Sequence, residues 1–254
     1  LREYLRTRLR EEAPAEFERL YQRAGELAEG AASLDAAVTY YLQGGHHQYV
    51  ARLLEHHGGD LIRQGRWLTL KSWFEALPSQ YWEDSPALLL TYAQVLQRTG
   101  ATDVALLHGQ RAVALAKALR DTRLAANALV TLARVLGPRG EFEDADELAK
   151  EALGLLPMSE PALRAAAHEV RGLCLRHLGK TGPALTELNL ARRNAAETTD
   201  TARQAQVARS LASVYLATDD LERAEVHYRA AFTLWQQQGD TPLQAAALNG
   251  LGLV

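Results

Sequence analysis

Cysteine, methionine and long apolar runs are scarce in this sequence of 254 residues. The only cysteine, Cys174, excludes an internal disulfide and any site built from several cysteine ligands. No stretch approaches ~18 consecutive apolar residues, so no membrane-spanning helix is predicted. The net charge is −3, whereas a nucleic-acid-binding surface generally shows as a basic excess. We therefore expect no direct contact with nucleic acid or membrane, and the low cysteine content fits a cytoplasmic location.

A charged-then-apolar leader is also missing at the start of the chain. The chain opens on Leu1, and its only methionine is Met158, which predicts a piece of a longer protein. Hydrophobic residues make up 47% of the sequence and charged residues 23%, and this balance excludes a disordered tail. Length alone would predict one or two globular domains.

What the sequence does contain is a repeated pattern of small residues around a turn. The segment 140–145 reads Gly-Glu-Phe-Glu-Asp-Ala, and the same frame begins at Gly100, Gly179 and Asp219. Each unit has a small residue twelve positions before the final alanine of the frame and another seven positions after it. The first set is Ala93, Ala133, Gly172 and Ala212, spaced 40, 39 and 40 apart, with Gly252 a further 40 on; the second is Ala112, Ala152, Ala191 and Ala231.

Stacked helical hairpins explain this pattern. Small residues allow two helices to approach closely, and large residues three positions later fill the space between them; these are Leu96, Leu136, Leu175 and Tyr215. A glycine after the first helix adopts the left-handed backbone that ends a helix at little cost. Helix starts are predicted where a capping side chain precedes a proline, at 85–86, 159–161 and 240–242. Pro78 and Pro157 are predicted to end helices.

The first third of the chain fits the same scheme less closely. Ala24, Leu27 and Ala36 are assigned to one hairpin. Leu53, Gly65 and Phe74 are assigned to a second. Before them, residues 1–10 form an amphipathic helical pattern with leucine at every fourth position, and Pro14 breaks the chain after it.

These features resemble the tetratricopeptide repeat, whose full pattern is matched by Ala133, Leu136, Gly140, Ala145, Ala149, Ala152 and Pro157. The resemblance implies an all-α fold, an α-solenoid or superhelix of helical hairpins. The period of about 40 residues departs from the usual ~34, so the helices or loops must be longer than in a standard repeat.

The front of the chain carries a second resemblance. The sequence segments that carry it are 1–10, Ala24-Gly25, 34–37, Gly65-Arg66, 73–78 and 86–89. Together they resemble the junction between the ATPase and helical-repeat modules in MalT-like proteins, the large ATP-dependent LuxR-type transcription activators. This implies that residues 1–12 are the last helix of a winged-helix/ATPase module, and that 13–254 form a repeat superhelix truncated in its last repeat. No nucleotide-binding loop and no helix-turn-helix occur in the sequence, so ATP and DNA binding would belong to the parent protein.

Two glycine motifs have structural interpretations that outweigh a nucleotide site. Gly179-Lys180-Thr181 resembles the end of a phosphate-binding loop, but that loop needs a glycine where Cys174 stands and a strand before it. Gly179 is already accounted for as a repeat turn. Gly250-x-Gly252 likewise lacks a preceding strand and is interpreted as a helix-packing position.

Metal and catalytic sites are not predicted. His46-His47 and His56-His57 would lie roughly 15 Å apart on one helix, too far to share an ion. Cys174 and His177 supply only two ligands, so a buried thiol beside a surface histidine is favoured. The acidic pairs 143–144 and 219–220 are interpreted as helix caps. We therefore predict no enzymatic activity in this segment.

The tryptophans could stack on a sugar, but packing explains them better. Trp73 is expected to pack between hairpins because its helix needs an apolar face, and Trp67 to help close a turn. Trp82 lies in a polar connection and is left open.

The candidate binding surface is the inner face of the first helix of each hairpin, which lines the concave groove in tetratricopeptide stacks. This projection selects Gln94, Arg98, Asn127, Thr131, Arg134, Glu169, Arg176, His177, Gln206, Arg209, Ser213 and Asn249. Arginine forks suit carboxylates and phosphates, and amides suit hydroxyls; Arg98, Arg134 and Arg209 are the favoured contacts. The alternative is a solvated helix face with no ligand.

The resemblance implies a signal-receiving role. A small-molecule inducer, or a regulatory protein or peptide, would bind the superhelix and control self-association and promoter binding by the parent protein. The alternative is a protein-binding scaffold with no small ligand, because solenoid grooves commonly accept peptides and partner helices.

Overall fold

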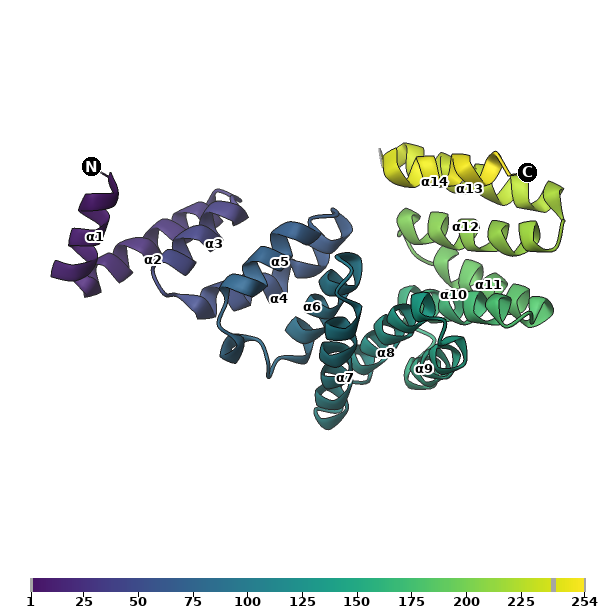
Figure 1. The fold of residues 1–254 in the computed structure, drawn as a ribbon, viewed down its shortest axis with the longest axis horizontal. Coiled ribbons are helices and arrows are strands. Elements are labelled where there is room, and N and C mark those ends of the chain that lie inside the picture. Colours follow the sequence, from purple (N-terminus) through teal and green to yellow (C-terminus); the bar gives the residue numbers. More distant parts are fainter. Residues whose placement is uncertain (1, 239–240, 254) are drawn as a thin grey trace. The chain divides into compact units, whose positions relative to one another are not determined.

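Helices account for 83% of the chain in the computed structural model, which describes residues 2–238 and 241–253. No strand occurs among these residues, and none of their helices is both long and apolar enough to cross a membrane. The fold is therefore an all-α helical-repeat solenoid, as predicted (Figure 1). The helices are α1 (Arg2–Glu12), α2 (Pro14–Gly30), α3 (Leu34–Gln43), α4 (His47–Arg63), α5 (Trp67–Ala76), α6 (Pro86–Arg98), α7 (Thr102–Ala118), α8 (Thr122–Leu136), α9 (Phe142–Leu155), α10 (Pro161–His177), α11 (Thr181–Ala196), α12 (Thr201–Ala217), α13 (Leu221–Gln238) and α14 (Thr241–Leu251).

The chain divides into two compact units, one extending to Leu115 and the other beginning at Ala116, so that the division falls within α7. Each unit is built of helical hairpins, and we call the first helix of a hairpin its A helix and the second its B helix. In unit 1 the hairpins are α2–α3 and α4–α5; in unit 2 they are α8–α9, α10–α11 and α12–α13. Within unit 2, α10 contacts both neighbouring A helices, α8 and α12.

The turn positions of the sequence frame adopt the left-handed backbone. Gly100, Gly140 and Gly179 have φ values of +86°, +81° and +72°, and Asp219 has a φ of +60°. The predicted role of these turn residues is thus confirmed. An aspartate can take the place of glycine in the last repeat because its short side chain tolerates this conformation better than most.

The small residues of the frame are buried in the contacts between helices, as predicted. Gly172 is the glycine among the four A-helix positions, and a Cβ atom there would lie 2.5 Å from Cγ of the buried Leu188 on α11. Gly252 does not fit the scheme, because it is exposed and follows the end of α14. The packed glycine of α14 is Gly250, where a Cβ atom would lie 2.3 Å from the Tyr228 ring.

The assignment of the first hairpin was one residue out of register. Leu27 is 69% exposed, and the glycine that meets the B helix is Gly25, against the ring of Tyr41. The alanine buried twelve positions later is Ala37 rather than Ala36. The error arose because alanine and glycine are adjacent at 24–25 and two alanines at 36–37, so composition could not fix which one faces the core.

Unit 1 also has a shorter period than unit 2. The equivalent A-helix position of the second hairpin is Gly58, which approaches Thr91 of α6, so the first spacings are 33 and 35 residues. The B helices explain the difference: α3 and α5 have 10 residues each, whereas α9, α11 and α13 have 14, 16 and 18. The extra residues of the 40-residue period therefore lengthen the B helices.

Helix starts follow the predictions only in part. Ser85 caps α6 by accepting a hydrogen bond of 3.3 Å from the Leu88 amide, and Asp220 accepts one of 3.2 Å from the Arg223 amide in α13. Glu160 precedes α10 but makes no side-chain cap, because its carboxylate pairs with Arg123 at 3.2 Å. Asp240 lies outside the described residues. Pro78 and Pro157 follow the ends of α5 and α9, as expected.

Packing accounts for the tryptophans of unit 1. Trp73 is buried, as predicted, and Trp67 is half-buried at the start of α5, just after the turn at Gly65. Trp82 is buried too, and its indole N–H donates to the Leu77 carbonyl at 3.2 Å.

Candidate functional site

A buried carboxylate joins the three A helices of unit 2. Glu169 on α10 is only 1% exposed. Its Oε2 atom accepts a hydrogen bond of 2.9 Å from Arg134 on α8, and its Oε1 atom accepts one of 2.9 Å from the Ser210 hydroxyl on α12. A second guanidinium, that of Arg203 on α12, lies 3.9 Å from Oε2. One side chain thus links three successive hairpins, and we call these four residues the Glu169 node.

Arg134 and Arg203 both approach the carboxylate of Glu169, and the Nε atom of Arg203 is buried without a hydrogen-bond partner in the part of the chain that the structure describes. Burial lowers the pKa of Arg203, and the charge of Arg134 lowers it further, whereas Glu169 and Asp200 act in the opposite direction. A buried donor without an acceptor is costly, so this arrangement favours an incoming anion.

Further along α10, Arg176 and His177 form a second polar group. Arg176 donates to Nε2 of His177 at 2.8 Å, and the His177 ring stacks on Phe142 of α9 at 4.3 Å between ring centroids. Burial, and then the charge of Arg176, lower the pKa of His177, so its ring is neutral and able to accept this bond. Cys174 beside them is buried, as predicted, and burial raises the pKa of its thiol to about 11.

The remaining predicted contacts lie in varied settings. Thr131 is buried and donates to the Asn127 carbonyl at 3.0 Å, so its hydroxyl is committed within α8. On α12, Gln206, Arg209 and Ser213 are partly exposed. Gln94 and Arg98 belong to α6 in unit 1, where the Arg98 guanidinium lies 5.0 Å from the centre of the Trp67 ring. Asn249 is exposed on α14.

Arg203 and Ser210 were not selected from the sequence. The sequence does contain a pattern that could have identified them, because positions 203, 206, 210 and 213 lie on one face of α12 at helical spacing. The projection took Gln206 and Ser213 from this stripe together with Arg209, and it missed Arg203 and Ser210, the residues that contact Glu169.

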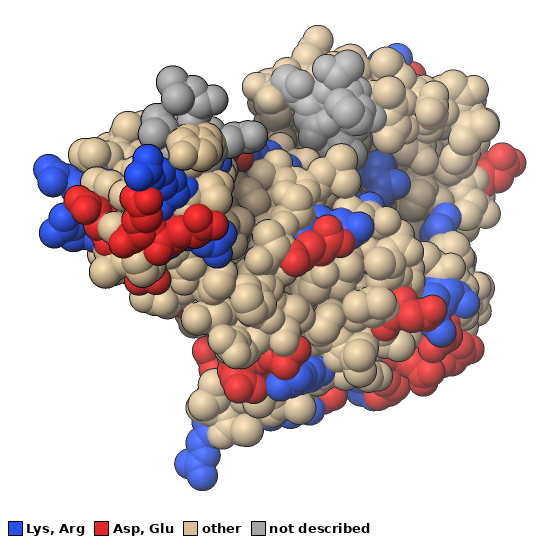
Figure 2. Space-filling model, turned by 60° about the vertical axis from the view of Figure 1, so that its left-hand side comes forward, with Lys and Arg blue, Asp and Glu red and all other residues tan. Residues whose placement is uncertain are grey.

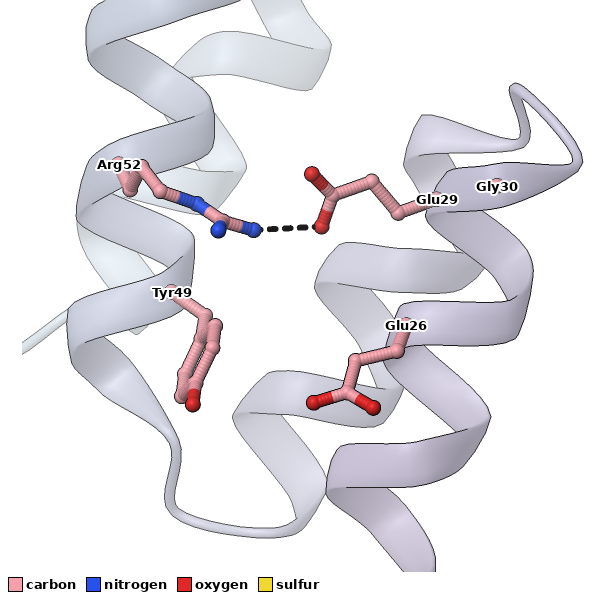
Figure 3. Close-up of a pocket in the computed structure, with 5 residues that line it drawn as sticks. All are labelled: Glu26, Glu29, Gly30, Tyr49 and Arg52. Carbon is pink, nitrogen blue, oxygen red and sulfur yellow. Dashed lines mark hydrogen bonds and ion pairs between the residues drawn. The ribbon is translucent and has the colours of Figure 1, made fainter.

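Unit 1 has a related contact between its A helices. Arg52 on α4 pairs with Glu29 on α2 at 2.6 Å, and the Tyr41 hydroxyl donates to the same carboxylate at 3.1 Å. Burial, followed by the hydrogen bond to Glu29, raises the pKa of Tyr41 to about 12. Figure 3 shows Arg52 pointing across to Glu29, with Tyr49 and Glu26 below them. These residues line an open hollow of about 480 Å³.

Basic and acidic side chains lie beside one another on the face drawn in Figure 2, rather than forming a continuous basic surface. Among the described residues, no group of three or more histidine, cysteine, aspartate or glutamate side chains could hold a metal ion. Among the polar groups that the fold does bring together are pairs between A helices, Arg134 with Glu169 in unit 2 and Arg52 with Glu29 in unit 1.

The similarity of this chain to known proteins is found at the level of structure. No family model matches the sequence, and no curated protein does. A thermophilic TPR protein of Thermus thermophilus is 24% identical, with a TM-score of 0.59, and the match covers 81% of this chain and 98% of that one.

Two larger proteins are also similar. A signal transduction ATPase with numerous domains (STAND) and a tetratricopeptide repeat sensor, from Pyrococcus horikoshii, is 14% identical with a TM-score of 0.67; the match covers 93% of this chain but only 36% of that protein. The Rap protein, solved in complex with Competence and Sporulation Factor, is 14% identical with a TM-score of 0.65, and coverage is 93% and 74%. At these identities the comparisons show the fold alone, which is that of tetratricopeptide-repeat proteins.

Proposed function

We propose that this chain is the signal-sensing repeat segment of a larger ATP-dependent transcription activator, in which residues 1–12 end the preceding module and 13–254 form the sensor. A ligand would bind the A-helix face of unit 2. The Glu169 node carries the proposal, because it joins α8, α10 and α12 through one buried carboxylate. A ligand that competes for Arg134 or Arg203 changes the contacts that set the spacing of three hairpins at once.

Such a ligand acts as a switch only if it binds two arrangements of the hairpins with different affinity. The buried position of Glu169 supports this, because losing a charged partner is far costlier there than at a solvated surface. Two of the similar structures support a sensing role: one is described as a tetratricopeptide repeat sensor, and the other is complexed with a named factor. Self-association and promoter binding would be the outputs of the parent protein.

Thermal unfolding of the chain against a panel of metabolites and synthetic peptides provides the first test. A ligand that binds the folded state raises Tm, and the increase grows with the logarithm of the ligand concentration above Kd. We expect at least one stabilising metabolite or peptide. Stabilisation only by a co-purifying protein would support the alternative, a scaffold without a small ligand.

A distance measurement then tests the switch. Spin labels at the exposed positions Thr122→Cys on α8 and Ala202→Cys on α12, with Cys174→Ala, report the spacing across the Glu169 node. The stabilising ligand should shift the distance distribution, and Glu169→Gln should reduce that shift. A ligand that raises Tm without moving the labels would contradict the switch.

The parent reading frame tests the wider assignment. A nucleotide-binding loop encoded upstream and a helix-turn-helix encoded downstream would support the activator. The absence of both would defeat it.

A further inference from the structure

The open hollow of unit 1 lies between two A helices and is lined by more negative than positive charge. Glu26, Glu29 and Gly30 line it from α2, and Tyr49 and Arg52 line it from α4 (Figure 3). Two carboxylates therefore face a single guanidinium group. Because the hollow is open, a group of another molecule can reach these carboxylates.

The single guanidinium group, that of Arg52, is held at one side of the hollow. Its Nη2 atom lies 2.6 Å from Oε2 of Glu29, and the guanidinium group lies 5.3 Å from the centre of the Tyr49 ring. The Tyr41 hydroxyl donates to the same Oε2 atom at 3.1 Å. Both donors thus reach one oxygen of Glu29, and its Oε1 atom accepts no hydrogen bond within the part of the chain that the structure describes.

Glu26 is held in the hollow by a neutral group rather than by a cation. The Gln22 amide donates to Oε1 of Glu26 at 2.9 Å and to the Tyr49 hydroxyl at 3.0 Å. Glu26 forms no ion pair with any residue of 2–238 or 241–253, and its Oε2 atom accepts no hydrogen bond from them. Glu26 and Glu29 are three residues apart on α2, so they are neighbours on the helix surface and their like charges repel.

We infer that this hollow binds the basic side chain, lysine or arginine, of a peptide segment that lies across α2 and α4. The cation lies between Oε2 of Glu26 and Oε1 of Glu29, where it relieves the repulsion between the two carboxylates. The Tyr49 ring provides apolar surface for the methylene groups of the incoming side chain. The inference concerns unit 1 and does not depend on the switch proposed for unit 2.

A peptide suits this site better than a free amine does. An ion pair at an open, hydrated position contributes little by itself, because solvent screens the charges and ordering the two side chains costs entropy. The residues on either side of the basic side chain must therefore supply further contacts on the A helices. The carboxylates of the hollow then select a basic residue at one position of the peptide, while most of the affinity comes from the rest of it.

Pooled synthetic peptides test the preference for charge. Each short, end-capped peptide carries one fixed central residue among randomised neutral residues, and the fixed residue is lysine, arginine, norleucine or citrulline. Norleucine and citrulline approximate the shapes of lysine and arginine but carry no charge. We expect the chain to bind the lysine or arginine pool in preference to the neutral pools. In the best single peptide, replacing the basic residue by its neutral counterpart should weaken the affinity about fivefold by fluorescence anisotropy.

Two variants locate the site. Glu26→Gln keeps the shape of the side chain and should weaken binding of the basic peptide about fivefold, with no effect on the neutral peptide. Gly30→Phe should also weaken the basic peptide, because a Cβ atom at Gly30 meets nothing within 4 Å and the added ring can occupy the hollow. The matched control is Glu11→Gln, which removes the same charge from an exposed position on α1. Circular dichroism melts confirm that each variant is folded before titration.

Equal binding of the charged and neutral pools, or no binding by any pool, would overturn the inference. So would equal losses of affinity in Glu26→Gln and Glu11→Gln, because they would indicate general attraction between opposite net charges. n-Butylamine serves as the free amine in a competition experiment. If it binds as tightly as the best peptide, the assignment to a peptide is wrong.

Discussion

The hydroxyl of Ser210 on α12 lies 2.9 Å from the Oε1 atom of Glu169 on α10, where it satisfies one oxygen of a carboxylate that is almost fully buried. The other oxygen accepts from Arg134 on α8, so neither oxygen lacks a donor. A charge at this depth is tolerated only because it is paired and hydrogen-bonded. The relationship makes Glu169 the position where a small chemical change should have the largest effect on unit 2.

Glu169→Gln should lower the free energy of unfolding by about 1.5–3 kcal/mol, the range for a lost hydrogen bond to a charged group. The amide keeps the shape of the side chain but removes the negative charge of Glu169 from beside Arg134 and Arg203. Urea unfolding followed by circular dichroism measures the change. Glu147→Gln is the control, because Glu147 is exposed and pairs with Lys150 on the surface, where such pairs contribute about 0.5 kcal/mol or less. Equal effects in the two variants would contradict the structural role of Glu169.

Gly172→Ala should destabilise unit 2 by about 1–3 kcal/mol, the usual cost of overpacking. The added Cβ atom would lie 2.5 Å from Cγ of Leu188, and Leu188 is fully buried, so it has little room to move. Thermal or urea unfolding detects the change.

The control for this variant is Gly154→Ala in α9, where a Cβ atom meets nothing within 4 Å. Here the better helix propensity of alanine should raise stability by up to about 1 kcal/mol. A loss of stability in both variants would show that the packing at Gly172 is not the cause.

The repeat frame was predictable because several constraints coincide in each repeat. At 140–145, a glycine turn, a helix start and a buried alanine all occur at fixed spacing, and the structure has Gly140 at positive φ and Ala145 fully buried. In the first hairpin the B helix is short and small residues are adjacent in the sequence, so fewer constraints fix the assignment. Either Ala24 or Gly25 satisfied the pattern, and only the approach of the Tyr41 ring distinguishes them.

The polar site was less predictable, because it depends on contacts between repeats. The position of Arg134 on the inner stripe followed from helical spacing, but its pairing with Glu169 depends on how far α10 is displaced along α8. The 40-residue period of the sequence does not determine that displacement. Arg203 was missed for the same reason, since it reaches Glu169 from the first turn of α12.

Asp219→Gly should raise the free energy of unfolding by about 0.5–1 kcal/mol, because glycine adopts a positive φ without the strain that a Cβ atom causes. Asp219 has a φ of +60° at the position where the other repeats have glycine. The reciprocal variant, Gly179→Ala, should destabilise by a similar amount. Its Cβ atom meets nothing within 4 Å, so backbone strain is the main cost. Urea unfolding of both variants checks the pair, and changes of the same sign would contradict the shared turn conformation.

Acidification should destabilise the protein through three histidines. Burial is the main cause that lowers the pKa of His108, His177 and His227 from the ordinary value of 6.5. Between each lowered pKa and 6.5, the unfolded chain binds more protons than the folded chain, so stability falls as the pH falls through this window and is unaffected above it.

Urea unfolding at about pH 7.5 and about pH 5.5 measures this loss. His177→Gln tests the assignment, because glutamine cannot take up a proton in this range and its side-chain oxygen can still accept the bond from Arg176. The variant should therefore lose less stability on acidification than the natural chain does. An unchanged loss would show that His177 does not contribute, and a flat profile in the natural chain would contradict the lowered pKa values of all three histidines.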